Sequence, residues 1–475
     1  MNDSCSEFRT IRMPPDGRIN HLASLPRRGN FGAALALAAG LSATAGMPAH
    51  ADAVIDWNET AETTAIMYAG PPPFQMRIMA MVQVAVHDAL NALQPRYGAY
   101  TEQPPANAGA SPEAAVAAAT YQVLLATVTL TAAQRDALTA TYTSRLDGLP
   151  DCPSTYPACI EDGVAVGEGA AESIIALRTG DGSASPHRPY TLQPAPGVHQ
   201  PTPPNYPAPA FAGWAEVTPF AINSAWQFRA DPAEVLDLGS DVYTRDYNEV
   251  KSVGAKTVRD SAPDSEQSQI ARFWPGGGAN WNSVARVIVA GRGLDMWQHA
   301  QLFALLNMAM SDALVTVFDT KYHYNFWRPA TAIRAAETDG NPATAPDPDW
   351  LSYQPTPPYP DYTCGLTTLT GSAVEVLRRY FRTDDVAYTF TATWPPANNP
   401  PLTRHFDSLS EAAEEAVDAR VFGGMHFRTG CVHGVRHGEQ VGRFVFQHEL
   451  KALKTKGKPA KASPKPAVGR KPTGW

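Results

Sequence analysis

The sequence predicts an all-α fold, a single bundle of helices joined by long proline-rich loops. Apolar residues recur three and four positions apart through most of the chain, which is the spacing of a buried helix face. No convincing set of strands and no internal repeat is visible. The 43 prolines among 475 residues are dense in 181–222 and 341–363, so these two stretches predict long irregular connections.

Each predicted helix carries its apolar residues on one face, and one of them also has clear end signals. Ser408 followed by Glu411 is a capping box that begins a helix, and Gly423 with Gly424 ends it. In chain order the predicted helices are 74–93, 111–128, 131–149, 162–180, 231–254, 264–274, 292–324, 367–381, 408–422 and 430–453.

The first 51 residues have the features of an export signal. An arginine pair at 27–28 precedes an apolar run over 31–47, and Ala-His-Ala at 49–51 fits a cleavage site. The apolar run is too short for a comfortable membrane span. We therefore expect a signal peptide (1–51) cleaved near Ala51, an exported protein that is periplasmic or secreted, and no membrane span in the mature chain.

The charge is unevenly distributed along the chain. The net charge is −8, but residues 451–475 carry eight basic residues and no acid, which predicts a basic disordered tail over 454–475. The domain between signal and tail, 52–453, is strongly acidic. An acidic body repels nucleic acid, so we expect no nucleic-acid partner.

Four cysteines remain after removal of the signal. Cys152 and Cys159 bracket a turn-rich octapeptide, and an oxidising compartment favours a local disulfide between them. Cys364 and Cys431 are then left for a second disulfide with each other. The alternative for this second pair is two buried free thiols.

The stretch KYHYNFWRP, 321–329, places two cations among aromatic side chains. Lys321 and Arg328 are seven positions apart, so on one helix they would share a face and their head groups could converge. Two cations in such apolar surroundings need an anionic partner. The alternative is an ordinary pair of surface cations lying over their aromatic neighbours.

Two further segments carry polar groups suited to an anion. In 418–428, Arg420 falls in the last turn of a helix and His426 begins the next segment. In 359–371, a loop reaches Gly365 and enters a helix whose first N–H groups point outward. Each segment alone is also explained by ordinary structure: a cation at a helix C-terminus, a packed histidine and a plain loop-to-helix junction.

Taken together, the three segments resemble the vanadium-dependent haloperoxidases and the related type 2 phosphatidic acid phosphatase (PAP2) superfamily. The family pattern is K-x6-R-P, then P-S-G-H, then S-R-x5-H. Here it is Lys321-x6-Arg328-Pro329, then Thr363-Cys364-Gly365-Leu366, then Ala419-Arg420-x5-His426. Further stretches such as VIDWNETA, FWRPATAIR and GGMHFR look like the bacterial exported branch, so the resemblance covers most of 54–447.

The resemblance implies a tetrahedral oxyanion, vanadate or phosphate, as the guest. Lys321, Arg328 and Arg420 would neutralise its equatorial oxygens, helped by the loop at Cys364 and the backbone N–H of Gly365. His426 would bind the central atom, as a vanadium ligand in a peroxidase or as a nucleophile in a phosphatase. The implied partners are hydrogen peroxide with a halide or another small substrate. Whether the protein forms a homodimer is left open by the sequence.

The chain departs from the family pattern at one catalytic position. Leu366 replaces the loop histidine that serves as acid–base, and such help is typically worth ~10²–10⁴ in rate. Thr367 or Thr368 holding a water, His323, or His433 are the conceivable substitutes. The sequence therefore leaves three functions open: a haloperoxidase-like enzyme with altered acid–base chemistry, an acid phosphatase-like phosphomonoesterase, or a non-catalytic oxyanion-binding relative.

Overall fold

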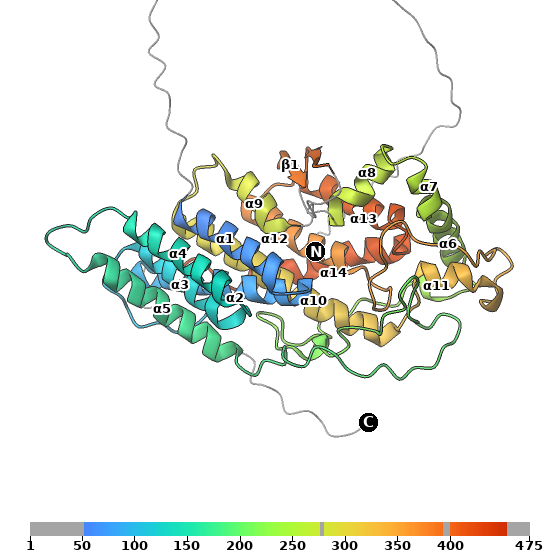
Figure 1. Cartoon of the computed structure of the whole chain (residues 1–475), viewed down its shortest axis with the longest axis horizontal. Helices are drawn as coiled ribbons and strands as arrows, with labels where there is room; N and C mark the ends of the chain where they lie inside the picture. Colours follow the sequence, from blue (N-terminus) through green and yellow to red (C-terminus); the bar gives the residue numbers. More distant parts are fainter. Residues whose placement is uncertain (1–51, 276–279, 393–399, 454–475) are drawn as a thin grey trace, which may run out of the picture. The chain divides into compact units, whose positions relative to one another are not determined.

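The structure is a computed structural model that describes residues 52–275, 280–392 and 400–453 (Figure 1). These residues are mostly helical, which confirms the predicted fold class. The predicted signal (1–51) and basic tail (454–475) lie outside the described residues and stay predictions.

The helices and the two strands follow one another along the chain as follows. The α-helices are α1 (Ala53–Tyr68), α2 (Pro72–Leu93), α3 (Pro112–Thr127), α4 (Ala132–Asp147), α5 (Cys159–Arg178), α6 (Asp241–Val253), α7 (Lys256–Asp260), α8 (Glu266–Phe273), α9 (Trp281–Val289), α10 (Met296–Tyr324), α11 (Pro329–Arg334), α12 (Gly365–Phe381), α13 (Leu409–Phe422) and α14 (Arg428–His448). Short 3-10 helices are η1 (Trp214–Glu216), η2 (Glu234–Leu236) and η4 (Ala336–Thr338), and the strands are β1 (Tyr388–Ala392) and β2 (Leu402–Phe406).

The structure corrects the sequence prediction in several places, and it adds helices α1, α7, α9 and α11, which were not predicted. The helix expected over 231–254 is η2 followed by α6, because the Asp237 side chain accepts the N–H of Gly239 in a turn and Ser240 caps a new helix. The expected absence of strands is also wrong, since β1 and β2 pair as an antiparallel hairpin with Tyr388 opposite Phe406. Alternation of threonine with aromatic residues in β1 was the signal for it.

Helices α12 and α14 pack very closely, and this contact positions the site. Gly434, Gly438 and Gly442 form one face of α14, and a Cβ atom at Gly438 would lie only 1.9 Å from the carbonyl oxygen of Thr368 on α12. Gly371 on α12 is equally close to α14, since a Cβ atom there would lie 2.2 Å from the Val435 carbonyl oxygen. The glycines therefore let the two backbones approach, and both helices also pack on α10 (Figure 1).

Helix α10 is the central core helix. Its length and mean hydropathy of 1.5 would suit a membrane span, which corrects the expectation that no segment after the signal is apolar enough. However, 94% of that apolar window is buried inside the protein, among α2, α12 and α14. The apolarity of α10 is therefore that of a helix buried on all sides.

The proline-rich connection 181–222 is pinned to α10 through Asp312. This fully buried carboxylate accepts the N–H groups of Phe220, Ala221 and Ile222 at 2.6–3.0 Å. Burial raises the pKa of Asp312 to about 6 against the opposing effect of these hydrogen bonds. Asp312 is therefore a structural anchor for this connection.

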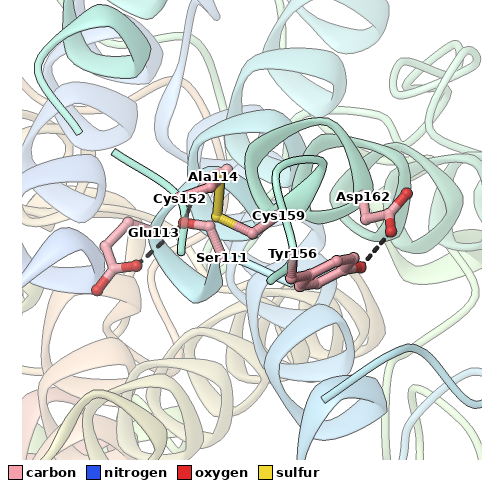
Figure 2. The surroundings of a disulfide bond; sticks show 7 residues. All are labelled: Ser111, Glu113, Ala114, Cys152, Tyr156, Cys159 and Asp162. Atoms are coloured by element: carbon pink, nitrogen blue, oxygen red, sulfur yellow. Dashed lines mark hydrogen bonds between the residues drawn. A yellow bond between two sulfur atoms is a disulfide. The ribbon is translucent and has the colours of Figure 1, made fainter. Parts of the chain in front are cut away.

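The predicted disulfide between Cys152 and Cys159 is present at the start of α5. Figure 2 shows it beside the first residues of α3, where the N–H of Ser111 donates to the carbonyl of Cys159 at 2.8 Å. Tyr156, inside the closed loop, donates to Asp162 on α5. The disulfide therefore closes the α4–α5 connection onto the start of α5, and the Ser111 hydrogen bond holds that point against the start of α3.

Candidate functional site: a buried cationic cluster beneath an apolar cavity

The turn between α10 and α11 brings Lys321 and Arg328 to one place. Helix α10 ends at Tyr324 because Asn325 adopts the left-handed conformation, with φ 52° and ψ 31°. Arg328 then lies at the N-cap of α11, so the expectation that both cations share one helix face is wrong. They converge because both side chains bind the backbone of the same segment, 359–363.

The Lys321 ammonium is fully buried and saturated with hydrogen bonds. It donates to the carbonyl oxygens of Pro360 and Asp361 at 2.9 Å each, and to that of Thr363. An ammonium has three donors, so all of them are used within the protein. Burial, and then the charge of Arg328, lower the pKa of Lys321 to about 7. Lys321 thus shapes the loop and contributes charge, while offering no free N–H in this arrangement.

The Arg328 guanidinium is fully buried and keeps one nitrogen free. Its Nε donates to the carbonyl of Tyr359 at 2.7 Å, and NH1 donates to the carbonyl of Met425 at 2.9 Å. NH1 also faces Nε2 of His426 at 2.9 Å. Its NH2 is buried without a hydrogen-bond partner, and such a donor is costly unless a ligand satisfies it.

Asp361 lies beside both Arg328 and His426, and the sequence analysis did not identify it. Its Oδ1 lies 2.8 Å from Nδ1 of His426 and 3.6 Å from NH1 of Arg328, and its side chain is 1% exposed. The structure records no hydrogen bond at Oδ1 among the described residues, so the approach to His426 is a close contact between a carboxylate and an imidazole. The only hint in the sequence was that Asp361 is the single acid of the segment 359–371.

Helix α12 begins at this cluster with an open N-terminus. Its N-cap, Cys364, makes no capping hydrogen bond with its side chain, so the helix's first N–H groups lack the usual acceptor. Gly365 lies against Lys321, with 3.9 Å between the position of an added Cβ and the lysine Cε. The partial positive charge of a helix N-terminus therefore adds to the three side-chain cations.

Arg420 and His426 are delivered by the turn between α13 and α14. Ser408 caps α13 by accepting the N–H of Glu411, which confirms half of the predicted capping box, whereas the Glu411 side chain accepts the N–H of Asp407 in place of that of Ser408. Helix α13 ends at Phe422 before its C-cap Gly423. Arg420 falls in the last turn, is 6% exposed, and its Nε has no hydrogen-bond partner. His426 is 1% exposed between the two helices.

A cavity of about 740 Å³ opens onto the cluster. The polar part of its lining is formed by Lys321, Gly365, Arg420 and His426, and Leu366 lies next to Gly365. The remaining wall is largely apolar, and its large side chains are Phe74, Phe211, Trp274, Leu314, Phe318, Tyr359 and Leu369. The arrangement can hold a small oxyanion on fixed cations while apolar side chains limit its contact with water.

One further histidine, His187, lines the same cavity and was also missed. Its Nδ1 accepts the N–H of Phe211 at 3.1 Å, so the neutral ring carries its proton on Nε2. It comes from the irregular connection 181–222, where sequence periodicity gives no positional information.

None of the four substitutes considered for the missing loop histidine lines this cavity. Thr367 and Thr368 are buried in α12 and donate to the carbonyl of Cys364. His433 faces the hydroxyl of Tyr362 at 2.9 Å, and His323 is exposed. Leu366 therefore has no replacement among them in this structure.

The expected disulfide between Cys364 and Cys431 is wrong, because both are free thiols. They are fully buried and hydrogen-bonded to each other, and Cys364 is also hydrogen-bonded to His426. Burial raises the pKa of both thiols, but the hydrogen bond from Cys431 and the nearby His426 and Arg420 bring the pKa of Cys364 below its usual value. The sulfur of Cys364 therefore makes hydrogen bonds with Cys431 and His426 and no disulfide bond.

Comparison with known proteins finds vanadium haloperoxidases. A family model described as the second helical-bundle domain of VCPO matches residues 301–455. Vanadium chloroperoxidase from Curvularia inaequalis is 24% identical over 273 residues, which is 44% of this chain and only 44% of that protein. The first bacterial vanadium-dependent iodoperoxidase has 27% identity and a TM-score of 0.70, over 85% of this chain and 97% of its own.

A second solved structure, a holo-type bacterial vanadium-dependent chloroperoxidase, shares the fold with a TM-score of 0.63 at 20% identity, over 82% of this chain and 95% of that one. Fold and site together describe a helical-bundle protein with a buried cationic cluster beside a cavity. The family-model match and these similarities support the vanadium haloperoxidase/PAP2 superfamily for this chain.

Proposed function

We propose that the protein is a vanadate-binding enzyme of the haloperoxidase type that uses hydrogen peroxide to oxidise a halide or another small substrate. The observation that carries this proposal is the convergence of Lys321, Arg420 and His426 on one cavity at the open N-terminus of α12, with Arg328 buried against His426. Among the described residues, the structure records one carboxylate beside these three cations, that of Asp361, so an anion is needed for charge balance.

The donor set of this chain fits a tetrahedral oxyanion. NH2 of Arg328 and Nε of Arg420 are buried donors without partners. The first N–H groups of α12, from Gly365 on, receive no bond from the N-cap side chain. These groups would hold the oxygens of vanadate, or of phosphate in its place, and His426 would be the ligand to the central atom. When bound, vanadate supplies a Lewis-acidic centre that activates hydrogen peroxide.

The protein residues around that guest act by charge and position. The ammonium of Lys321 holds the carbonyls of 360–363 in place, which fixes the entry of the chain into α12. Asp361 stabilises positive charge on His426 and Arg328 through its close Oδ1. Because these groups are preorganised and buried, they stabilise developing negative charge without reorganising.

The proposal is tested with purified protein loaded with orthovanadate. We expect peroxide-dependent bromination of a phenolic dye, which falls to background in His426→Ala, because the central atom loses its protein ligand. His433→Gln is the matched control: this histidine lies on α14 and contacts Tyr362, but it does not line the cavity. Its turnover should stay within about twofold of the unsubstituted protein.

The other outcomes separate the two alternative functions. Phosphate release from a chromogenic ester, inhibited by vanadate and without bromination, would assign a phosphomonoesterase with His426 as nucleophile. Tight vanadate binding with neither activity would assign a non-catalytic oxyanion-binding protein. Absence of vanadate binding would overturn the whole proposal.

We also propose that the chain is exported, with residues 1–51 as its signal. The Cys152–Cys159 disulfide supports an oxidising compartment. Asp52 supports the same boundary, since it caps α1 and contacts His299 of α10 at 2.6 Å. N-terminal sequencing of the protein from its native host should therefore find a mature start near Asp52, and recovery of the intact N-terminus from the cytoplasm would contradict export.

A further inference from the structure

A cluster of soft ligands shares His426 with the function proposed above and adds two thiols, those of Cys364 and Cys431, to which that function gives no role. The sulfur atoms of Cys364 and Cys431 and one ring nitrogen of His426 all lie within 4.8 Å of one another. All three side chains are at most 1% exposed. They come from the N-cap of α12, the first turn of α14 and the segment before it, and a 3.0 Å bond from the N–H of Cys364 to the carbonyl of Gly430 joins these elements.

The spacing suits a metal ion with two sulfur ligands and one nitrogen ligand. Metal–sulfur and metal–nitrogen bonds of about 2.0–2.3 Å place neighbouring donor atoms roughly 3.5–4 Å apart. The observed spread of 4.8 Å therefore needs only small side-chain movements. His426 lines the cavity, so a metal ion has a route in, and Asp361 beside Nδ1 resembles the carboxylate that often supports a metal-bound histidine.

The charges around the cluster select the kind of metal. Thiolate and imidazole ligands favour Cu(I) and Zn(II) among biological ions. A Cu(I) ion held by two thiolates carries a net charge of −1, whereas the corresponding Zn(II) group is neutral. Lys321, Arg328 and Arg420 surround this position and stabilise an anionic group. The same cations that would attract an oxyanion therefore favour the copper group.

We propose that Cys364, Cys431 and His426 form a binding site for Cu(I). Binding replaces the two thiol protons by one copper ion and leaves the oxidation state of the metal unchanged. Because His426 would also be the ligand to an oxyanion's central atom, copper and vanadate would compete for the protein. Contact between NH1 of Arg328 and Nε2 of His426 must open for either guest.

The test uses the full chain, reduced and kept under inert gas, titrated with Cu(I) against a chromophoric Cu(I) chelator. We expect one ion per chain, and a loss of affinity of at least about 100-fold in Cys431→Ser, since even loss of a supporting group costs 10–100-fold. The matched control is His433→Gln, two positions from Cys431 on the same helix, which should bind copper as the unsubstituted protein does. X-ray absorption of the copper-loaded unsubstituted protein should show two sulfur neighbours of the copper ion. This measurement does not depend on whether the Cys431→Ser variant folds.

Two results would overturn the copper site: no stoichiometric Cu(I) binding, or binding of equal affinity in Cys431→Ser. Neither bears on the oxyanion proposal, because Cys431→Ser should still bind orthovanadate. Copper pre-loading should weaken vanadate binding at least tenfold if His426 is shared, and undiminished vanadate binding to the copper-loaded protein would remove His426 from the copper ligands.

Discussion

Replacing Leu366 by histidine should raise the peroxidase turnover of the vanadate-loaded protein by ~10²–10⁴, the usual contribution of a positioned acid–base group. Leu366 is half-buried at the first turn of α12 and lines the cavity next to Gly365. A histidine there would reach the same space with a proton-carrying nitrogen. The helix N-terminus disfavours its charged form, so the neutral ring, able to accept and return a proton, would predominate at neutral pH.

The control for this gain is Leu366→Gln, which is polar and similar in size but cannot titrate. It should change turnover by less than about threefold, so that a gain in the histidine variant reports proton transfer and not simply polarity. A flat result in Leu366→His, combined with a large loss in His187→Gln, would contradict this assignment. That combination would place the acid–base role on His187, the other histidine of the cavity.

The pattern of the three segments was enough to predict which residues meet, but not how they meet. Lys321 and Arg328 were expected to converge along one helix, and Arg328 instead lies beyond a left-handed turn at Asn325. An asparagine is one of the few residues that tolerates this conformation, yet nothing in periodicity requires the turn at that position. The spacing of the motif residues therefore predicted which side chains meet. The apolar periodicity predicted the helices, but it could not predict the turn that joins them.

What the sequence could not supply is the set of contacts made by irregular segments. Asp361 and His187 belong to proline-rich loops, whose paths depend on tertiary hydrogen bonds such as those to Asp312. The thiols of Cys364 and Cys431 were assigned by counting cysteines, and counting cannot weigh a covalent bond against a hydrogen bond to a neighbouring histidine. Such choices depend on distances of a few tenths of an ångström.

Replacing Lys321 by methionine should weaken vanadate binding by about 2–5 kcal/mol, which is the usual loss when one member of a buried charged cluster is removed. Methionine keeps the unbranched shape, so the core of α10 stays packed, but it removes the charge and frees the carbonyls of Pro360 and Asp361. The affinity is measured by titration with orthovanadate, and chemical denaturation of both proteins checks that the variant is folded. Lys256→Met, an exposed lysine paired with Asp260, is the matched control and should bind as before.

The pH dependence of binding identifies the role of Lys321 more sharply than the loss of affinity does. With a pKa lowered to about 7, this lysine is charged below pH 7 and neutral above it, so the attraction for an anion should fall as pH rises through that value. Lysine with an ordinary pKa would hold its charge to about pH 10. Vanadate also changes its own protonation with pH. The ligand is the same for both proteins, so this contribution cancels when the affinity of Lys321→Met is compared with that of the unsubstituted protein at each pH. Parallel pH profiles for the two proteins would mean that Lys321 does not titrate in this range, and its charge would then be constant while the anion binds.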